Sequence, residues 1–231
     1  MPSSVVVLTV SWALMEWLRG QLFTGFPWNS LGSIWVISDV ALQMAAYVGV
    51  LGLSLLTVFI SASLAMLAYS LSSFNRYWFV PPMACLLIIF LPGLFRLGFD
   101  DPLKYYPDIR LRIVQPNIAQ KVKWRRDLKD KHLATYLSLS KLPAVSPITH
   151  LVWPETAAPF EVSRDVFRRK QIATVVPQYG FLLTGSIRTN DAGSGPLEIW
   201  NSFHVLSSSG TIEKTHDKFH LVPFGEYIPL G

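Results

Sequence analysis

The chain has 231 residues, of which 51% are hydrophobic and 15% are charged, and its formal net charge at pH 7 is +5. The whole positive excess lies in residues 101–231, because residues 1–100 hold three arginines and three acidic residues. The single cysteine excludes a disulfide within the chain. The charge-poor first hundred residues argue against a uniformly water-soluble protein, because such a composition is typical of a membrane region. The composition of the remaining residues is typical of a water-soluble domain.

The first hundred residues predict about three membrane helices. The run Val5–Leu18 is short for a span of about 20 residues, and Glu16 lies near its end. It has neither the basic start nor the small-residue cleavage site of a signal peptide, which favours a short or tilted helix. Two longer uncharged runs, Val40–Leu71 and Tyr77–Phe95, are of spanning length.

Between the first two predicted helices, residues 20–35 are apolar, aromatic and rich in glycine. This composition suits neither a spanning helix nor a soluble loop, and tryptophan and phenylalanine favour the headgroup level of a bilayer. We therefore expect an interfacial or re-entrant segment. A plain aromatic anchor with no further role is equally consistent with the composition.

One arginine decides the expected orientation. The short loop Ser72–Tyr77 carries Arg76, and the positive-inside tendency places this loop in the cytoplasm. The helix that follows then leads outward, so residues 101–231 are expected on the extracytoplasmic side.

From Arg110 onward, short apolar runs alternate with amphipathic segments, which predicts an α/β layer with helices packed on a sheet. The expected domains are therefore a membrane region, residues 1–100, and an α/β domain, residues 101–231. Strands are predicted at Leu111–Val114, Thr149–Trp153, Phe181–Gly185, Asn201–Ser207 and around Ile212, and helices at Lys123–Leu142 and from an N-cap at Ser163 to Val176.

Three ionisable side chains lie among apolar and aromatic neighbours, where pKa values are perturbed and catalytic groups occur. Glu155 follows Trp153-Pro154 at the end of a predicted buried strand, where functional groups of α/β sheets gather. Lys218 and Glu226 flank an apolar, aromatic motif. We predict direct or one-water contact between the Glu155 carboxylate and the Lys218 ammonium, although a glutamate at a strand end and a surface lysine are also ordinary features.

Two other patterns are weaker. His216 and His220 have the spacing of metal ligands on one helix, but no third ligand is evident, so we expect neither a metal nor another cofactor. The basic run Lys121–His132 contains Asp127 and Asp130 at helical spacing. This favours a solvated helix face, near anionic headgroups, over a nucleic-acid site.

The motifs resemble those of the bacterial apolipoprotein N-acyltransferases, membrane enzymes whose extracytoplasmic domain has the nitrilase fold. The main signatures are Trp-Pro-Glu-Thr-Ala at 153–157 and Lys-Phe-His-Leu-Val-Pro-Phe-Gly-Glu-Tyr at 218–227. The resemblance extends over nearly the whole chain. Further similar signatures are Gln-Pro-Asn-Ile at 115–118, Trp124, Asn201-Ser202, Glu-Trp-Leu-Arg-Gly at 16–20 and Thr-Gly-Phe-Pro-Trp at 24–28.

This resemblance implies a partial nitrilase-like αββα sandwich preceded by transmembrane helices, in a multi-pass protein of the bacterial inner membrane whose soluble domain faces the periplasm. It implies transfer of an acyl chain from a phospholipid to the α-amino group of the N-terminal S-diacylglyceryl cysteine of a lipoprotein, through a thioester. Membrane lipid and lipoprotein would be the partners, with no nucleic acid.

The resemblance also implies roles for single residues. Glu155 would be the general base, Lys218 would stabilise the oxyanion, and Glu226 would be a further essential carboxylate. Substrate contacts would come from Trp124, near the acyl-chain entrance, and from Gly25 and Trp28 in the membrane region.

The family's catalytic triad is Glu-Lys-Cys, and here the only cysteine is Cys85, in an apolar run where hydrocarbon disfavours the thiolate. The family's nucleophilic cysteine follows the lysine motif, beyond Gly231, so the chain is expected to be a fragment that is inactive alone. Two alternatives stay open: a non-catalytic membrane-anchored module that binds lipid or lipoprotein, and a nitrilase-type amidase or acyltransferase with another substrate.

Overall fold

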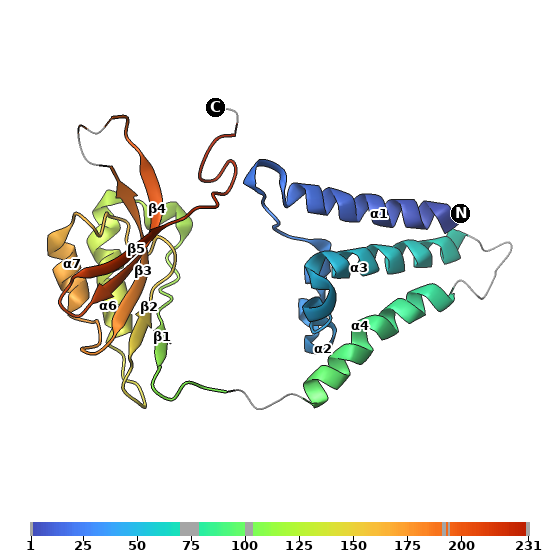
Figure 1. Cartoon of the computed structure of the whole chain (residues 1–231), viewed down its shortest axis with the longest axis horizontal. Helices are drawn as coiled ribbons and strands as arrows, with labels where there is room; N and C mark the ends of the chain where they lie inside the picture. The colour runs from blue at the N-terminus through green and yellow to red at the C-terminus, as the bar shows by residue number, and fades with distance from the viewer. Residues whose placement is uncertain (1, 70–78, 100–103, 191–192, 194, 230–231) are drawn as a thin grey trace. The chain divides into compact units, whose positions relative to one another are not determined.

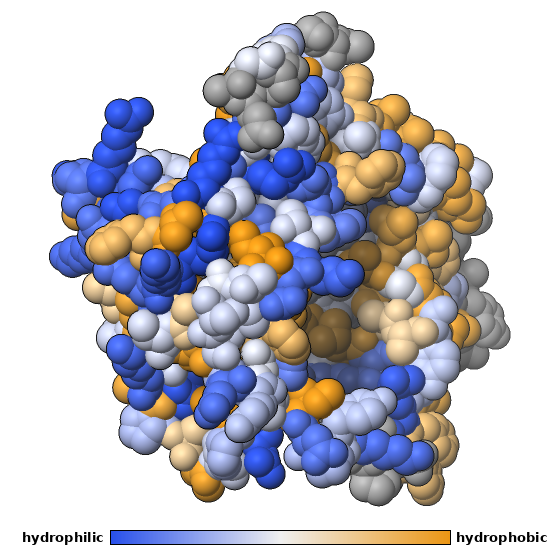
Figure 2. Space-filling view, turned by 60° about the vertical axis from the view of Figure 1, so that its left-hand side comes forward, coloured by the Kyte–Doolittle hydropathy of each residue, from blue (hydrophilic) through white to orange (hydrophobic). Residues whose placement is uncertain are grey.

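The computed structural model describes residues 2–69, 79–99, 104–190, 193 and 195–229. They fall into two compact units, a helical unit within residues 1–103 and 220–231, and a sheet unit of residues 104–219. Residues 220–229 belong to the helical unit, whereas the sequence predicts them in the α/β domain, residues 101–231. Figure 2 shows the chemical contrast between the units: the sheet unit is mostly hydrophilic at its surface, and hydrophobic residues gather over the helices.

Within its described residues, the helical unit contains three long helices and three short ones (Figure 1). Two stretches of the described residues, Ala45–Met66 and Val80–Gly98, are long and apolar enough to cross a membrane, and only a minority of the residues in each is buried. The elements are α1 (Pro2–Arg19), the 3-10 helices η1 (Leu22–Thr24) and η2 (Leu31–Ile37), α2 (Asp39–Leu42), α3 (Ala45–Tyr69) and α4 (Val80–Gly98).

The predicted continuous helix over Val40–Leu71 is divided in the structure. The chain forms α2, turns, and enters α3, in which Gly49 has φ 66° and interrupts the helix; residues 70 and 71 lie outside the described part. Glycine adopts this conformation without strain, so an uncharged run does not by itself specify one straight helix. Another glycine, Gly93 of α4, allows close packing on α2, since a Cβ there would lie 1.9 Å from the Val40 carbonyl oxygen.

The sheet unit is a mixed α/β structure with a five-stranded sheet in the order β1-β2-β3-β4-β5. Strands β1 to β3 are parallel, and β4 and β5 continue the sheet antiparallel to their neighbours. The strands are β1 (Leu111–Ile113), β2 (His150–Val152), β3 (Phe181–Thr189), β4 (Ile199–Ser207) and β5 (Ile212–Asp217). The helices are α5 (Gln120–Lys123), η4 (Arg126–Leu128), α6 (Lys129–Ser140) and α7 (Val166–Ala173).

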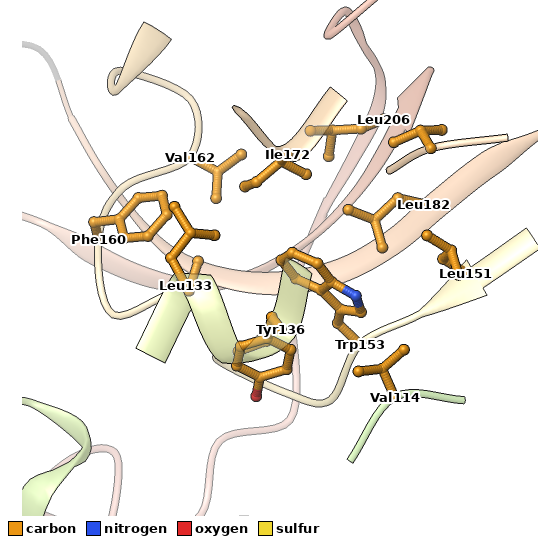
Figure 3. Close-up of a cluster of buried hydrophobic side chains, with 13 residues drawn as sticks. Val114, Leu133, Tyr136, Leu151, Trp153, Phe160, Val162, Ile172, Leu182 and Leu206 are labelled. Carbon is orange, nitrogen blue, oxygen red and sulfur yellow. The ribbon is translucent and has the colours of Figure 1, made fainter. Parts of the chain in front are cut away.

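Helices α6 and α7 cover one face of this sheet and enclose its core (Figure 3). Leu151, Leu182 and Leu206 are paired in register across β2, β3 and β4 and are almost completely buried. Each contributes roughly 1.5–3 kcal/mol by leaving water. Tyr136 of α6 packs on Trp153 with ring centroids 4.7 Å apart.

The opposite face of the sheet carries several exposed aliphatic side chains. Side chains in register share a face, and this face carries Leu111, Ile113 and Ile199, which are 59%, 76% and 62% exposed. The row Ile113, Val152, Leu183 and Val205 crosses the sheet on this side.

Two predicted helices differ from the structure. The segment Lys123–Leu142 is not one helix: α5 ends at Lys123, Arg125 is extended and pairs with Asp127, and α6 begins at Lys129. The predicted N-cap at Ser163 is wrong. Its hydroxyl donates to Glu161, and Asp165 caps α7 by accepting the Arg168 N–H at 2.9 Å.

Candidate active site

The predicted contact between Glu155 and Lys218 is present. Lys218 Nζ lies 3.2 Å from Glu155 Oε1, and the two side chains are 32% and 61% exposed. Glu155 follows the end of β2, and Lys218 immediately follows β5. Because β5 runs in the same direction as β2, both strands end at the same edge of the sheet, where α/β folds assemble their sites.

Two hydrogen bonds of Trp153 fix the segment between β2 and Glu155. Trp153 N–H donates to the Leu183 carbonyl at 2.8 Å, and its buried indole N–H donates to Ser140 Oγ at 3.0 Å. Thr156, just after the glutamate, has φ 49°, a left-handed conformation. A small residue in β3 makes room for this turn: a Cβ on Gly185 would lie 2.4 Å from Thr156 N and 2.9 Å from Glu155 Cα.

A third side chain contacts the same carboxylate. Asn201 Nδ2 donates to Glu155 Oε1, and the Asn201 carbonyl accepts the backbone N–H of Lys218 at 2.7 Å. Glu155 Oε1 is therefore approached by a cation and an amide from two adjacent strands. Asn201 belongs to one of the signatures that resemble the family, but its contact with Glu155 was not predicted. The available signal is its position as the first residue of the predicted strand Asn201–Ser207.

Lys123 is a second cation at the site, and the sequence motifs do not predict it. Its Nζ donates to the Glu155 carbonyl oxygen at 3.3 Å and lies 5.9 Å from the centre of the Trp124 ring. Burial lowers the pKa of Lys123, and the charge of Glu155 acts in the opposite direction. Trp124 is half exposed beside it.

A cavity of about 220 Å³ opens next to Glu155. Its wall is polar near Lys123 and closes on α6, where burial raises the pKa of Tyr136 to about 12. His132 also lines it, and its Nδ1 has no hydrogen-bond partner among the described residues. The lining residues are Gln115, Pro116, Asn117, Ile118, Gln120, Lys123, His132, Tyr136, Pro154, Glu155, Ala157 and Pro159.

The other predicted site residues belong to the helical unit. Glu226 Oε2 accepts the Val222 N–H at 2.8 Å, which closes a turn within the motif. Gly25 has φ 86°, and a Cβ there would lie 2.0 Å from the Gly20 carbonyl oxygen. Trp28 is exposed and stacks on Phe26 with ring centroids 5.9 Å apart.

The same unit holds a hydrogen-bonded link between its first loop and the residues after 220. Thr24 Oγ1 donates to the Leu221 carbonyl at 2.6 Å, and the Tyr227 hydroxyl donates to the Phe23 carbonyl. Phe23 and Phe224 meet edge to face at 6.4 Å. The motif around Glu226 is thus fastened to the aromatic segment that contains Gly25 and Trp28.

The two histidines that have helical spacing do not share a helix. His216 lies in β5, and His220 lies in the segment assigned to the helical unit. Within the described ranges, no group of three or more His, Cys, Asp or Glu side chains could hold a metal ion.

Comparisons with known proteins match almost the whole chain. Residues 1–63 match the family described as "Apolipoprotein N-acyltransferase N-terminal domain". Over 97% of its length the chain is 38% identical to the apolipoprotein N-acyltransferase of Rhodopseudomonas palustris and 35% identical to that of Bradyrhizobium diazoefficiens, and over 98% it is 33% identical to that of Rhizobium meliloti. The chain spans less than half of these relatives: 44%, 44% and 43% of their lengths.

Proposed function

Because this chain is homologous to part of the apolipoprotein N-acyltransferases, we propose that it carries part of the machinery of lipoprotein N-acylation. The reaction is the transfer of an acyl chain from a phospholipid to the α-amino group of an N-terminal S-diacylglyceryl cysteine. The observation that carries the proposal is the 3.2 Å contact between Glu155 and Lys218, two residues separated by 63 positions that meet at one edge of the sheet.

Glu155 is the general base in this proposal. Its side chain is exposed, so a proton donor can reach the carboxylate, and three donors, Lys218, Asn201 and Lys123, fix the residue from different sides. A base positioned in this way can remove a proton from a thiol or an amine in the transition state.

Lys218 stabilises the oxyanion that forms when the acyl carbonyl is attacked. Its ammonium is held by Glu155 before substrate arrives, and a preorganised cation costs little reorganisation during the reaction. Glu226 is assigned as a further essential carboxylate. Trp124, Gly25 and Trp28 are assigned as contacts of the acyl chain, because the rings of Trp124 and Trp28 are exposed and Gly25 lies in the same apolar, aromatic segment as Trp28.

A thioester route needs a thiolate, which is the intrinsically strong nucleophile for an ester. Cys85 packs in the buried cluster of the helical unit with Met44, Leu53 and Ile89. We assign it to packing, and the proposal assigns no residue of this chain as the nucleophile.

The sheet unit is proposed to be part of a nitrilase-like αββα sandwich. Helices cover one sheet face, and the other exposes a row of aliphatic side chains that a second sheet would bury in such a fold. The apolar helices α3 and α4 support a location in the inner membrane, with the sheet unit on the periplasmic side as Arg76 favours.

A chimera tests the proposal. The segment of the Rhodopseudomonas palustris relative that aligns with the chain is replaced by residues 1–231, and N-acylation of a diacylglyceryl lipopeptide is measured with phospholipid as donor. We expect activity in the chimera and a loss of ~10² or more in Glu155→Gln, the scale of losing a general base.

The matched control is Glu213→Gln, which removes an exposed carboxylate from β5. It should leave the rate unchanged. An inactive but folded chimera, or an active Glu155→Gln variant, contradicts the proposed function and favours a module that binds lipid without turnover.

A further inference from the structure

The ends of β4 and β5 present different residues on their two faces. Ser202 and Asp217 are paired in register and face the side covered by helices. Asn201 precedes Ser202 and Lys218 follows Asp217, so both of these neighbours point to the opposite side of the sheet, where both contact Glu155. The two residues that hold Glu155 are thus each adjacent to a member of one cross-strand pair.

Asp217 of this pair is bonded to two other strands through Arg188 and Ser202, an arrangement called the ionic tie below. Asp217 Oδ1 accepts hydrogen bonds from the Ser202 hydroxyl at 2.6 Å and from Arg188 Nε at 3.1 Å, and Asp217 Oδ2 accepts one from Arg188 Nη2 at 2.6 Å. Arg188 comes from β3 and also stacks on Trp200 of β4, with its guanidinium carbon 4.0 Å from the ring centre. One carboxylate therefore joins three neighbouring strands.

Both charged groups of the tie are about two-thirds buried, which strengthens a bidentate arginine–carboxylate pair. The hydrogen bonds from Arg188 hold the pKa of Asp217 below its usual range, with a further contribution from Ser202. Asp217 is ionised at neutral pH and keeps all three of its hydrogen bonds.

Polar contacts are needed to set the register of β4 and β5, because the pairing of these two strands is irregular. A bulge lies between Val205 and Leu206, so the apolar pattern at that end of the pair does not set the register at the other end. A slip of one residue would turn Lys218 to the helix-covered face and Asp217 toward Glu155. Next to the tie, the buried His204 forms hydrogen bonds with Thr215 Oγ1 at 2.9 Å and with Ser186 Oγ at 3.1 Å. These bonds connect the same three strands two residues farther along β4.

We propose that Asp217 is a positioning residue for the Glu155–Lys218 pair: its ties to Arg188 and Ser202 set the register of β4 and β5 so that Asn201 and Lys218 both reach the Glu155 carboxylate. A catalytic role for this positioning rests on the proposed function. The effect of Asp217 on the position of Lys218 does not, and it can be measured without any acyl transfer.

The test uses the 231-residue chain in detergent. Competitive acetylation compares the reactivity of the Lys218 amine with that of Lys214, an exposed lysine on the same strand. In Asp217→Asn we expect Lys218 to react about tenfold faster relative to Lys214, the scale of losing one hydrogen bond to a charged group. Glu213→Gln, which removes a carboxylate from β5 outside the tie, should leave the ratio unchanged.

Backbone hydrogen exchange separates positioning from general support of the fold. In Asp217→Asn the amide of Lys218, which donates to Asn201, should exchange faster, while Leu182 and Leu206 in the core keep their protection. An unchanged Lys218 ratio overturns the proposal. Faster exchange at Leu182 also overturns it, because Asp217 would then support the whole sheet.

The chimera adds a readout that depends on chemistry. There Asp217→Asn should lower kcat with KM nearly unchanged, because the pair is misplaced while the substrate contacts remain. An inactive parent chimera would count against the proposed function, and the labelling ratio would still decide whether Asp217 positions Lys218.

Discussion

Glu161 is a carboxylate outside the candidate site that ties its loop to the sheet. It accepts the backbone N–H and the hydroxyl of Thr189, at 3.1 and 2.9 Å, and the Ser163 hydroxyl at 3.0 Å. Burial alone would raise the pKa of Glu161, but these hydrogen bonds and the charge of Arg164 lower it overall from 4.5. The ionised form is therefore favoured by folding.

This shift predicts how stability depends on pH. A carboxyl group whose pKa is depressed in the folded state stabilises the protein above its unfolded pKa, and this contribution is lost as pH falls through the folded pKa. In Glu161→Gln the free energy of unfolding should be lower at pH 7 and should fall less steeply between about pH 5 and pH 3 than in the parent chain.

Urea unfolding at several pH values checks this, with the signal of 5-fluorotryptophan at the buried Trp153 as the probe. Glu198→Gln, at an exposed position, is the control and should keep the parent slope. Equal slopes in the parent and Glu161→Gln would show that Glu161 is not stabilised as an anion.

At the scale of the elements, β3 shapes the site through an absent side chain. A Cβ on Gly185 would lie 2.4 Å from Thr156 N, which is a backbone atom. The position of a Cβ is fixed by its own backbone, so no side-chain rotation relieves this contact. Gly185→Ala should therefore displace the turn after β2 at a cost of roughly 1–3 kcal/mol, the range for overpacking.

The measurement is the acetylation ratio of Lys218 to Lys214 together with the unfolding free energy. Both should change, because the displaced turn carries Glu155 away from the lysine. Ala158→Gly, a second small-residue change on the buried side, should lower stability without raising the Lys218 ratio. An unchanged acetylation ratio of Lys218 to Lys214 in Gly185→Ala would show that the turn accommodates a Cβ without moving Glu155.

Strands were easier to predict from this sequence than helices. The runs at 111–114, 149–153 and 201–207 lie within two residues of β1, β2 and β4, because short apolar segments between turn residues leave little choice. The helix starts were wrong where a side chain found another partner: Asp127 pairs with Arg125, and Ser163 donates to Glu161.

The candidate site was predictable in part. The contact of Glu155 with Lys218 was predicted because two ionisable motifs that share one site must converge, and only Glu155 was expected at a strand end. The contacts of Asn201 and Lys123 depend on register and on the turn after α5. Neither register nor such a turn is encoded by local periodicity. The roles of Glu155, Lys218 and Glu226 stay predictions.

For the whole molecule, the two units differ in their surface chemistry (Figure 2). In the helical unit only a minority of the residues of the apolar helices α3 and α4 is buried. The sheet unit buries one continuous core and holds the Glu155–Lys218 pair. The chain spans less than half the length of its curated relatives, so its contribution to the reaction is best measured inside one of them.

The central claim is that Glu155 and Lys218 act as one catalytic pair, and a double-mutant cycle in the chimera tests it most directly. The rate of N-acylation is compared among the parent, Glu155→Gln, Lys218→Met and the double variant. We predict that each single change lowers kcat by ~10² or more and that the double variant is about as slow as the slower single one, since groups that act as a unit are strongly non-additive. Losses that multiply, or single variants that acylate at the parent rate, would contradict the account.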